Sequence, residues 1–409
     1  MASNYRKLGE FIEQTNERND TLRVTKLLGV SIEKKFMPSI ANTIGTDFSS
    51  YKVVHPGEFA YGPVTSRNGD KISIAYYEDV DDCIISSSYT PFAIVEDGLQ
   101  AEYLMMWFNR SEFDRYARFK SHGSAREVFD WDQLCAVELP VPDIETQCKI
   151  VGIKKCIEAR MNSLAEQNDY LEELIGAMFN EFYMAKWGED LPCGWSFHRV
   201  EDIAEKVAMG PFGSNIKVET FVEEGVSIIS GAHLRGLLLE EVEYNHITEE
   251  HAERLHNSIV YPGDIVFTHA GNIGQAALIT EWSNEPKYII SQRQFYLRCD
   301  KSKMLPEIPA LYFHTRIGKH VLTANSTSTG VPSIAQPSSY LKSIELLVPD
   351  MESQKRFVKK IKPLLHLIVL NRKECKGLEQ LRDTLLPKLM SGEIDVSKVD
   401  ITQLNNHLA

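Results

Sequence analysis

Histidine and cysteine side chains are the first candidates for metal or covalent chemistry in this 409-residue chain. His251 and His256 stand in the stretch HAERLH, which has neither the spacing nor the glutamate of a zinc-binding helix, so we interpret both as surface residues. The seven cysteines are odd in number and include no CxxC pair, which favours inert thiols in a reducing compartment. The sequence therefore predicts no metal site and no disulfide framework.

Signatures of nucleotide chemistry are also missing from the sequence. It has no P-loop GxxxxGK[ST], no glycine-rich cofactor turn with an Asn/Asp-Pro-Pro-aromatic motif, and no cluster of nuclease carboxylates. We therefore expect no catalytic residues and no cofactor bound to this chain. Polar side chains on glycine-rich hairpin tips and loops remain as the groups able to recognise a ligand, because loops on a rigid scaffold commonly carry recognition.

Two long amphipathic stretches are expected to position those loops. They start at Asp143 and Asp350 and align without a gap, because Pro349 lies 207 positions (349 − 142) after Pro142. Both open with V-P-D-x-E-x-Q and then carry apolar residues at alternating steps of three and four, the spacing of a coiled-coil seam. Pro363 favours a kink in the second helix. The predicted seam residues are Ile150, Ile153, Ile157, Leu164 and Leu171 in the first stretch and Ile361, Leu364, Ile368, Leu378 and Leu381 in the second.

The segments before the two helices repeat a second plan with different residues. FAYGPVTSRNGDKISIAYY and YPGDIVFTHAGNIGQAALI each predict a β-hairpin, and each is followed by a further strand, a helical patch and a polar loop. The chain is thus a tandem duplication, of fold class α/β (α+β). We predict two mixed α/β modules joined by two long antiparallel coiled-coil helices with pseudo-two-fold symmetry. The predicted boundaries are 1–142 for the first module, 143–186 for the first helix, 187–349 for the second module, 350–392 for the second helix and 393–409 for a tail.

Several motifs together resemble one known family. V-P-D-x-E-x-Q opens both helices, LLPKLMSGEI closes the second, and MGPFGSNIK stands near the start of the second module. In this order, and with the 207-residue repeat, they are similar to the specificity (S) subunit of a Type I restriction-modification system. The resemblance implies that each module is a target recognition domain for one part of a bipartite, asymmetric site in double-stranded DNA.

The same resemblance implies partners and cofactors. The paired helices are expected to bind two methyltransferase (M) subunits, and restriction (R) subunits are expected to join that assembly. S-adenosylmethionine, ATP and Mg are then expected on the partner subunits, with this chain as a non-catalytic member. Neither a signal-peptide core nor a run of about 18 apolar residues appears in the sequence, so we expect a cytoplasmic protein without a membrane role.

The candidate DNA-binding residues are polar side chains on the predicted hairpin tips and loops. Arginine can bind guanine with two hydrogen bonds in the major groove, and asparagine or glutamine can bind adenine in the same way. His269 stands where the family often has an arginine, which makes a DNA contact there less secure. The candidates are Ser66, Arg67, Asn68, Lys71 and Arg126 in the first module and Lys217, His269, Asn272, Gln275 and Arg293 in the second.

The net charge of −13 is the main objection to a DNA-binding function, because affinity for duplex DNA depends on lysine and arginine at the phosphates. Residues 1–142 carry 15 Lys+Arg against 21 acids and residues 187–349 carry 13 against 20, whereas residues 350–392 carry 10 against 5. Neither module is basic. We therefore expect weak DNA binding by the chain alone and further phosphate contacts from partner subunits.

Two other functions stay open at this stage. One is a structural coiled-coil adaptor without direct DNA readout, and the other is a DNA adenine methyltransferase with its own recognition domain. The contrast between matched helices and divergent modules favours one frame that holds two different DNA-reading modules.

Overall fold

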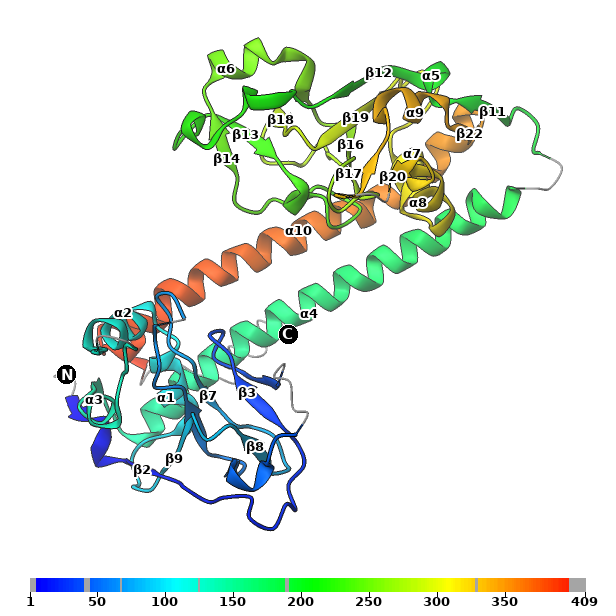
Figure 1. Cartoon of the computed structure of the whole chain (residues 1–409). Helices are drawn as coiled ribbons and strands as arrows, with labels where there is room; N and C mark the ends of the chain where they lie inside the picture. The colour runs from blue at the N-terminus through cyan, green and yellow to red at the C-terminus, as the bar shows by residue number, and fades with distance from the viewer. Residues whose placement is uncertain are drawn as a thin grey trace. The chain divides into compact units, whose positions relative to one another are not determined.

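The computed structural model describes residues 5–39, 45–66, 68–123, 126–187, 191–327 and 330–396 (Figure 1). It divides into two compact units: unit 1 comprises Met1–Asn162 and Lys376–Ala409, and unit 2 comprises Ser163–Cys375. Each unit combines a mixed α/β module with parts of two long helices, which confirms the predicted fold class. The unit boundaries fall inside the long helices, and the domain boundaries given above stay a prediction.

The module of unit 1 is built around a four-stranded antiparallel sheet in the order β2-β9-β6-β7. Smaller pairs flank it: β1 with β10, β3 with β4, and β5 with β8. The strands are β1 Tyr5–Lys7, β2 Ile12–Gln14, β3 Leu28–Val30, β4 Phe36–Pro38, β5 Lys52–Val54, β6 Phe59–Tyr61, β7 Ile74–Tyr76, β8 Cys83–Ile85, β9 Thr90–Ile94 and β10 Glu138–Pro140. The helices are α1 Ala101–Phe108, α2 Ser111–Lys120 and α3 Trp131–Cys135, with 3-10 turns η1 Leu8–Glu10 and η2 Phe48–Ser50.

The module of unit 2 has two four-stranded sheets, in the orders β12-β19-β16-β17 and β14-β13-β18-β15, and two smaller pairs, β11 with β22 and β20 with β21. The strands are β11 Ser196–Arg199, β12 Ala204–Met209, β13 Val226–Ile229, β14 Asn245–Ile247, β15 Ile259–Val260, β16 Asp264–Thr268, β17 Ala276–Leu278, β18 Tyr288–Ile290, β19 Gln294–Cys299, β20 Ser326–Thr327, β21 Ser333–Ile334 and β22 Glu345–Val348. The helices are α5 Val200–Ile203, α6 Glu249–Arg254, α7 Glu307–His314, α8 Arg316–Thr323 and α9 Pro337–Ser343, with 3-10 turns η3 Met184–Lys186, η4 Gly213–Asn215, η5 Val218–Thr220, η6 Gly231–His233 and η7 His256–Ser258.

The central sheets of the two units share one topology. β2-β9-β6-β7 and β12-β19-β16-β17 place corresponding strands in the same order, and the hairpins β6–β7 and β16–β17 are antiparallel as predicted. In each unit a strand at the start of the module pairs with the strand just before the long helix, β1 with β10 and β11 with β22. The duplication seen in the sequence is therefore also present in the fold.

The long helices are α4, Ile144–Phe182, and α10, Met351–Met390. Asp143 caps the first through a hydrogen bond that its carboxylate accepts from the Thr146 amide at 2.9 Å, and Asp350 caps the second by accepting from the Ser353 amide at 2.9 Å. α10 continues as one helix through Pro363, whose ring is exposed. The carbonyl that loses its partner at a helix proline can bond to water there, and the predicted bend stays a prediction.

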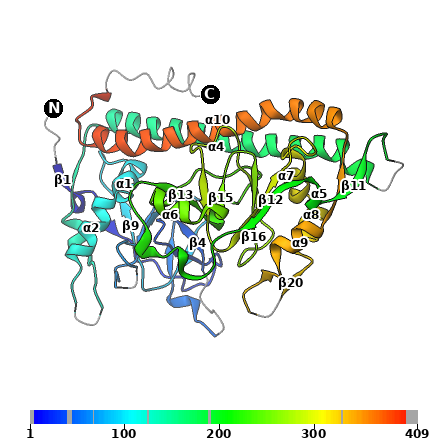
Figure 2. The same ribbon diagram turned by 90° about the horizontal axis from the view of Figure 1, so that it is seen from above.

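The two helices run side by side in opposite directions within each unit (Figure 2). In unit 2 the side-chain amide of Asn371 donates to the side-chain oxygen of Asn168 at 2.9 Å. The ring of Phe182 stacks on that of Phe357, with 4.3 Å between the ring centroids. An early residue of α10 thus meets a late residue of α4, and residues near the middle of the two helices meet each other. The antiparallel arrangement predicted from the repeat is confirmed.

Most of the predicted seam residues are covered. Leu171 and Leu364 are half-buried, and Leu381 is 47% exposed. The 3.6-residue turn of an α-helix drifts about 20° per heptad against a strict stripe, so a residue late in the stripe can rotate out of the seam, as Leu381 does. The buried seam residues are Ile150, Ile153, Ile157, Leu164, Ile361, Ile368 and Leu378.

One buried glutamine at the start of each long helix fastens the helix to its module. Gln147 donates to the carbonyls of Gly98 and Pro142, both at 2.7 Å, and accepts from the Gln100 amide at 2.9 Å. It is fully buried, and its bonds reach the segment that leads into α1.

Gln354 repeats this arrangement in unit 2. It donates to the carbonyls of Lys303 at 3.0 Å and Pro349 at 2.8 Å, and it accepts from the Leu305 amide at 2.8 Å. Because the helix and the α/β module are joined in the same way in both units, the loops of each module are held at a defined place on its helix.

Candidate nucleic-acid interface

Three loops of unit 2 meet beside the tip of the β16–β17 hairpin. The His269 amide donates to the Arg293 carbonyl at 2.9 Å, the Ile334 amide donates to the His269 carbonyl at 2.8 Å, and the Gly271 amide donates to the Pro332 carbonyl at 3.0 Å. The structure thus brings together two candidate residues that are far apart in the sequence, His269 and Arg293. Backbone hydrogen bonds of this kind fix the loops without using the side chains that could contact a ligand.

The candidate side chains in this loop cluster differ in accessibility. Asn272 and Arg293 are exposed, whereas His269 and Gln275 are half-buried. The His269 Nε2 donates to the Gln292 carbonyl at 3.1 Å, which holds the imidazole against the protein. The buried Gln275 Oε1 accepts no hydrogen bond from the residues that the structure describes. Asn272 and Arg293 are therefore the candidate side chains of this cluster that are most accessible to a ligand.

Lys217 lies on a different loop, directly before η5, and its side chain is exposed. The start of this loop packs closely on the start of β19, because the Gly210 amide donates to the Gln294 carbonyl at 2.8 Å. A Cβ atom at Gly210 would lie 2.0 Å from the Ser291 carbonyl oxygen, so only glycine permits this approach. This contact gives a physical reason for the first glycine of the motif MGPFGSNIK.

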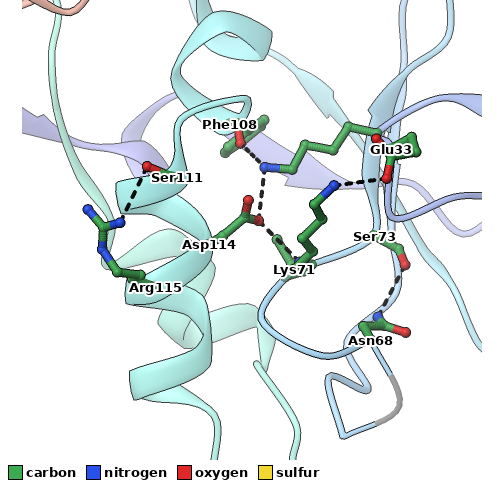
Figure 3. Close-up of polar contacts among 10 residues, drawn as sticks. Glu33, Asn68, Lys71, Ser73, Phe108, Ser111, Asp114 and Arg115 are labelled. Atoms are coloured by element: carbon green, nitrogen blue, oxygen red, sulfur yellow. Dashed lines mark hydrogen bonds and ion pairs between the residues drawn. The ribbon is translucent and has the colours of Figure 1, made fainter. Parts of the chain in front are cut away.

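In unit 1 the corresponding hairpin tip engages its own polar side chains. The Asn68 side chain donates to the Val64 carbonyl at 3.3 Å and to the Ser73 hydroxyl at 3.2 Å. The Lys71 ammonium lies 2.8 Å from a Glu33 carboxylate oxygen, and this carboxylate raises the pKa of Lys71 (Figure 3). Both candidates must give up or share these partners to contact a ligand.

The other candidates of unit 1 lie on the hairpin tip and on the loop after α2. Ser66 and Arg126 are exposed, and Arg67 lies outside the described residues. The Thr65 amide donates to the Glu127 carbonyl at 2.9 Å, so the residues next to Ser66 and Arg126 are in direct contact. Unit 1 therefore presents the exposed Arg126 beside its hairpin tip, as unit 2 presents the exposed Arg293.

Across the described parts of the chain, no group of three or more His, Cys, Asp or Glu side chains is arranged to hold a metal ion. The His251 Nε2 donates to the Asn215 carbonyl at 2.7 Å, and His256 is exposed. None of the helices in the same residue ranges is long and apolar enough to cross a membrane.

The comparison with known proteins agrees with this geometry. A model of the Type I restriction modification DNA specificity domain matches residues 192–380, which contain all the unit 2 loops described above. The MjaIX Type I specificity subunit of Methanocaldococcus jannaschii is 23% identical over 75% of this chain and 72% of its own length. The HindI Type I specificity subunit of Haemophilus influenzae is 21% identical over 90% of this chain and 93% of its own length. Residues 192–380 thus match the specificity domain, and both relatives are similar to this chain over most of its length.

Solved structures of similar chains show that this chain shares their fold. A Type I S subunit from M. genitalium has a TM-score of 0.54 at 13% identity, with 95% of this chain and 96% of that one covered. A chain from a structure on the assembly of a type I R-M system has a TM-score of 0.51 at 17% identity, with 96% and 98% covered. At these identities the likeness concerns the fold alone.

Sequence reasoning did not single out Gln147 and Gln354, the two glutamines that fasten the long helices to their modules and are here called the latch residues. Gln147 and Gln354 carry a signal that could have found them, since a glutamine repeats at the seventh position of V-P-D-x-E-x-Q. A polar residue that recurs identically at the start of two amphipathic helices is a candidate for buried hydrogen bonding. The partners of that glutamine lie outside the motif and have no signal of their own.

Proposed function

We propose that this chain is the non-catalytic DNA-reading subunit of a Type I restriction-modification complex, in which each unit reads one half of a bipartite, asymmetric site in double-stranded DNA. The observation that carries the proposal is one frame with two different sets of loops. The sheet order and the glutamine latch repeat in both units, while the exposed polar side chains on the hairpins differ. Different loop side chains on equivalent scaffolds favour different base sequences in the two half-sites.

The surface of the long helices supports docking of partner proteins. Large apolar side chains of α4 and α10 are exposed in unit 2, and contiguous exposed apolar surface is typical of protein interfaces. We propose that two methyltransferase subunits bind these helices and that restriction subunits join the assembly. S-adenosylmethionine, ATP and Mg would then be bound by those partners. The exposed side chains are Tyr170 at 70%, Leu174 at 48%, Leu367 at 42% and Leu370 at 48%.

Exchange of one module tests the proposal. Residues 187–349 are replaced by the second module of another family member, the chimera is expressed with the methyltransferase partner, and methylated sites are mapped across the host genome. One half-site should change while the other keeps its sequence. The reciprocal exchange of residues 1–142 is the matched control and should change only the other half-site. The proposal fails if either exchange alters both half-sites or neither.

A further inference from the structure

A buried lysine in unit 1 has no part in the function proposed so far. Lys34 lies in the turn between β3 and β4 with a left-handed φ of 58°, and the residue is only 9% exposed. Burying an ammonium group is costly unless partners surround it, so its contacts must compensate for the lost hydration. Burial lowers the pKa of Lys34, and the neighbouring Asp114 carboxylate opposes that effect.

Lys34 connects its turn to the helices α1 and α2. Its Nζ lies 2.9 Å from the Asp114 Oδ1 in α2 and also donates to the Phe108 carbonyl at the end of α1 (Figure 3). The Asp114 side chain is itself only 13% exposed. The pair is therefore a buried contact between three chain segments.

Asp114 extends the connection to the hairpin that carries candidate DNA-binding residues. Its Oδ1 accepts a hydrogen bond from the Ile72 amide at 3.1 Å, and Ile72 is 1% exposed at the start of the returning arm. Beside it, Lys71 pairs with Glu33 of the same β3–β4 turn. The base of the hairpin tip is thus fastened to the turn and to α2.

The second unit shows why the first needs such a fastening. The Gly62 amide donates to the Ser73 carbonyl, and the Thr268 amide donates to the Gln275 carbonyl, so these bonds close equivalent hairpin tips. The tip has ten residues in unit 1 (63–72) and six in unit 2 (269–274). A longer loop has more conformational entropy to lose before its side chains reach fixed positions.

Stability alone is a poor explanation for this pair. A buried ion pair is often no more stabilising than apolar residues of the same volume, whereas it fixes the geometry of the groups that it joins. Lys34 and Asp114 hold the hairpin at its base and leave the tip residue Ser66 exposed. This arrangement suits a positioning role.

We propose that Lys34 and Asp114 are positioning residues that clamp the first hairpin, so that its tip presents a single arrangement of side chains to the first half-site. The clamp rests on the proposed function, because it has a reading role only if unit 1 reads DNA. It makes no direct contact with DNA. Its effect is confined to the half-site read by unit 1.

The test uses the full chain in complex with its methyltransferase partner. K34M leaves Asp114 buried without its counter-ion, whereas K34M/D114N removes both charges and keeps an acceptor for the Ile72 amide. We expect K34M/D114N to melt close to the parent protein and to lose about tenfold or more in discrimination at one or more base pairs of the first half-site. The second half-site should be unchanged. K26M, which breaks the exposed Lys26–Asp79 pair, is the control and should leave both half-sites unchanged.

Each outcome of this experiment is decisive. A folded K34M/D114N complex that discriminates like the parent at the first half-site overturns the clamp. If K34M/D114N does not fold, D114E takes its place, since it keeps the charge and shifts the contact with Ile72 by one methylene. Unchanged discrimination by D114E then overturns the clamp, and relaxed discrimination at the first half-site supports it. A parent complex that directs no methylation at all contradicts the proposed function, which is a separate failure.

Discussion

Gln147 in unit 1 and Gln354 in unit 2 are fully buried and make equivalent hydrogen bonds, two donated and one accepted. An aligned pair of acids in the same units behaves differently. Glu58 accepts a hydrogen bond from the His55 amide, and Asp264 accepts one from the Tyr261 amide.

Only Asp264 also forms a two-point ion pair, with Arg298 at 2.8 and 2.6 Å. Arg298 lies opposite Asp264 in the pairing of β16 with β19. In unit 1 Phe59 pairs with Phe92, so the next residue, Ala93, takes the place that Arg298 has in unit 2. The two copies thus keep the bonds that join module to helix, and they differ in the side chains that each module uses for its own interior and loops. The hydrogen bonds that join module to helix are therefore repeated more closely between the two units than the side-chain pairs inside each module.

Removing Arg298 should give the largest effect, and it should be confined to unit 2. Asp264 is only 1% exposed, so R298M leaves a buried carboxylate without its counter-ion. This should lower the opening free energy of unit 2 by about 3–5 kcal/mol. Amide hydrogen exchange of the full chain, followed by peptide, measures the opening free energy of each unit. E58Q in unit 1 is the matched control and should change opening by less than about 1 kcal/mol, because the amide oxygen can still accept from His55. A loss in unit 2 no larger than that of the control would contradict the role assigned to the ion pair.

The latches should show the opposite behaviour, with equal effects in the two units. Q147L and Q354L each remove the hydrogen-bond partner of one backbone amide and two backbone carbonyls. Each should therefore lower the opening free energy of its own unit by about 2–4 kcal/mol. The same exchange experiment measures both variants. E145Q, at an exposed position of the same motif, is the control and should have little effect. Losses that differ by more than about 1 kcal/mol between Q147L and Q354L would break the equivalence.

The sequence predicted the features that repeat or follow a period. The two long helices and both hairpins follow from turn residues and apolar spacing, which are local properties. The pairing of Lys71 with Glu33 could not be predicted, because these residues stand 38 positions apart and meet only through the fold. Buried Lys34 gave no signal for the same reason. Residue type and loop position therefore predict DNA contacts at Lys71 and His269, but they carry no sign of the partners that hold these side chains.

That difference in partners predicts unequal effects on DNA binding. Arg293 is exposed, so R293A should weaken binding of the full complex to its site by about 1–3 kcal/mol if the arginine contacts a base. K71A should weaken binding by about threefold or less, since Lys71 must first share its charge with Glu33. Equilibrium titrations at several salt concentrations measure both effects and separate a base contact from a phosphate contact. An effect of K71A that exceeds that of R293A would reverse the comparison.

Acid should give the smallest effect, and its sign should differ between the units. Burial lowers the pKa of His233 and of His314 in unit 2. The His233 Nδ1 accepts from the Ser230 amide at 3.0 Å, an arrangement that only the neutral ring permits. In the unfolded chain both histidines bind protons near pH 6.5, whereas in the folded unit they resist protonation. The stability that they contribute is complete above about pH 6.5 and is lost as the pH falls from there towards their folded pKa values.

His55 in unit 1 reverses this dependence. The Asp82 carboxylate, 2.8 Å from its Nδ1, raises the pKa of His55 above its ordinary value. The stability from this pair is therefore present below about pH 6.5 and is lost as the pH rises through the folded pKa, although its half-exposed position keeps the effect small. Hydrogen exchange at pH 5.5 and 7.5, corrected for intrinsic rates, should show unit 2 opening more easily at the lower pH. Unit 1 should instead gain stability at the lower pH from the His55–Asp82 pair, and H55Q should remove that gain. If both units respond to acid with the same sign in the parent and in H55Q, burial of His233 and His314 does not set the difference between them.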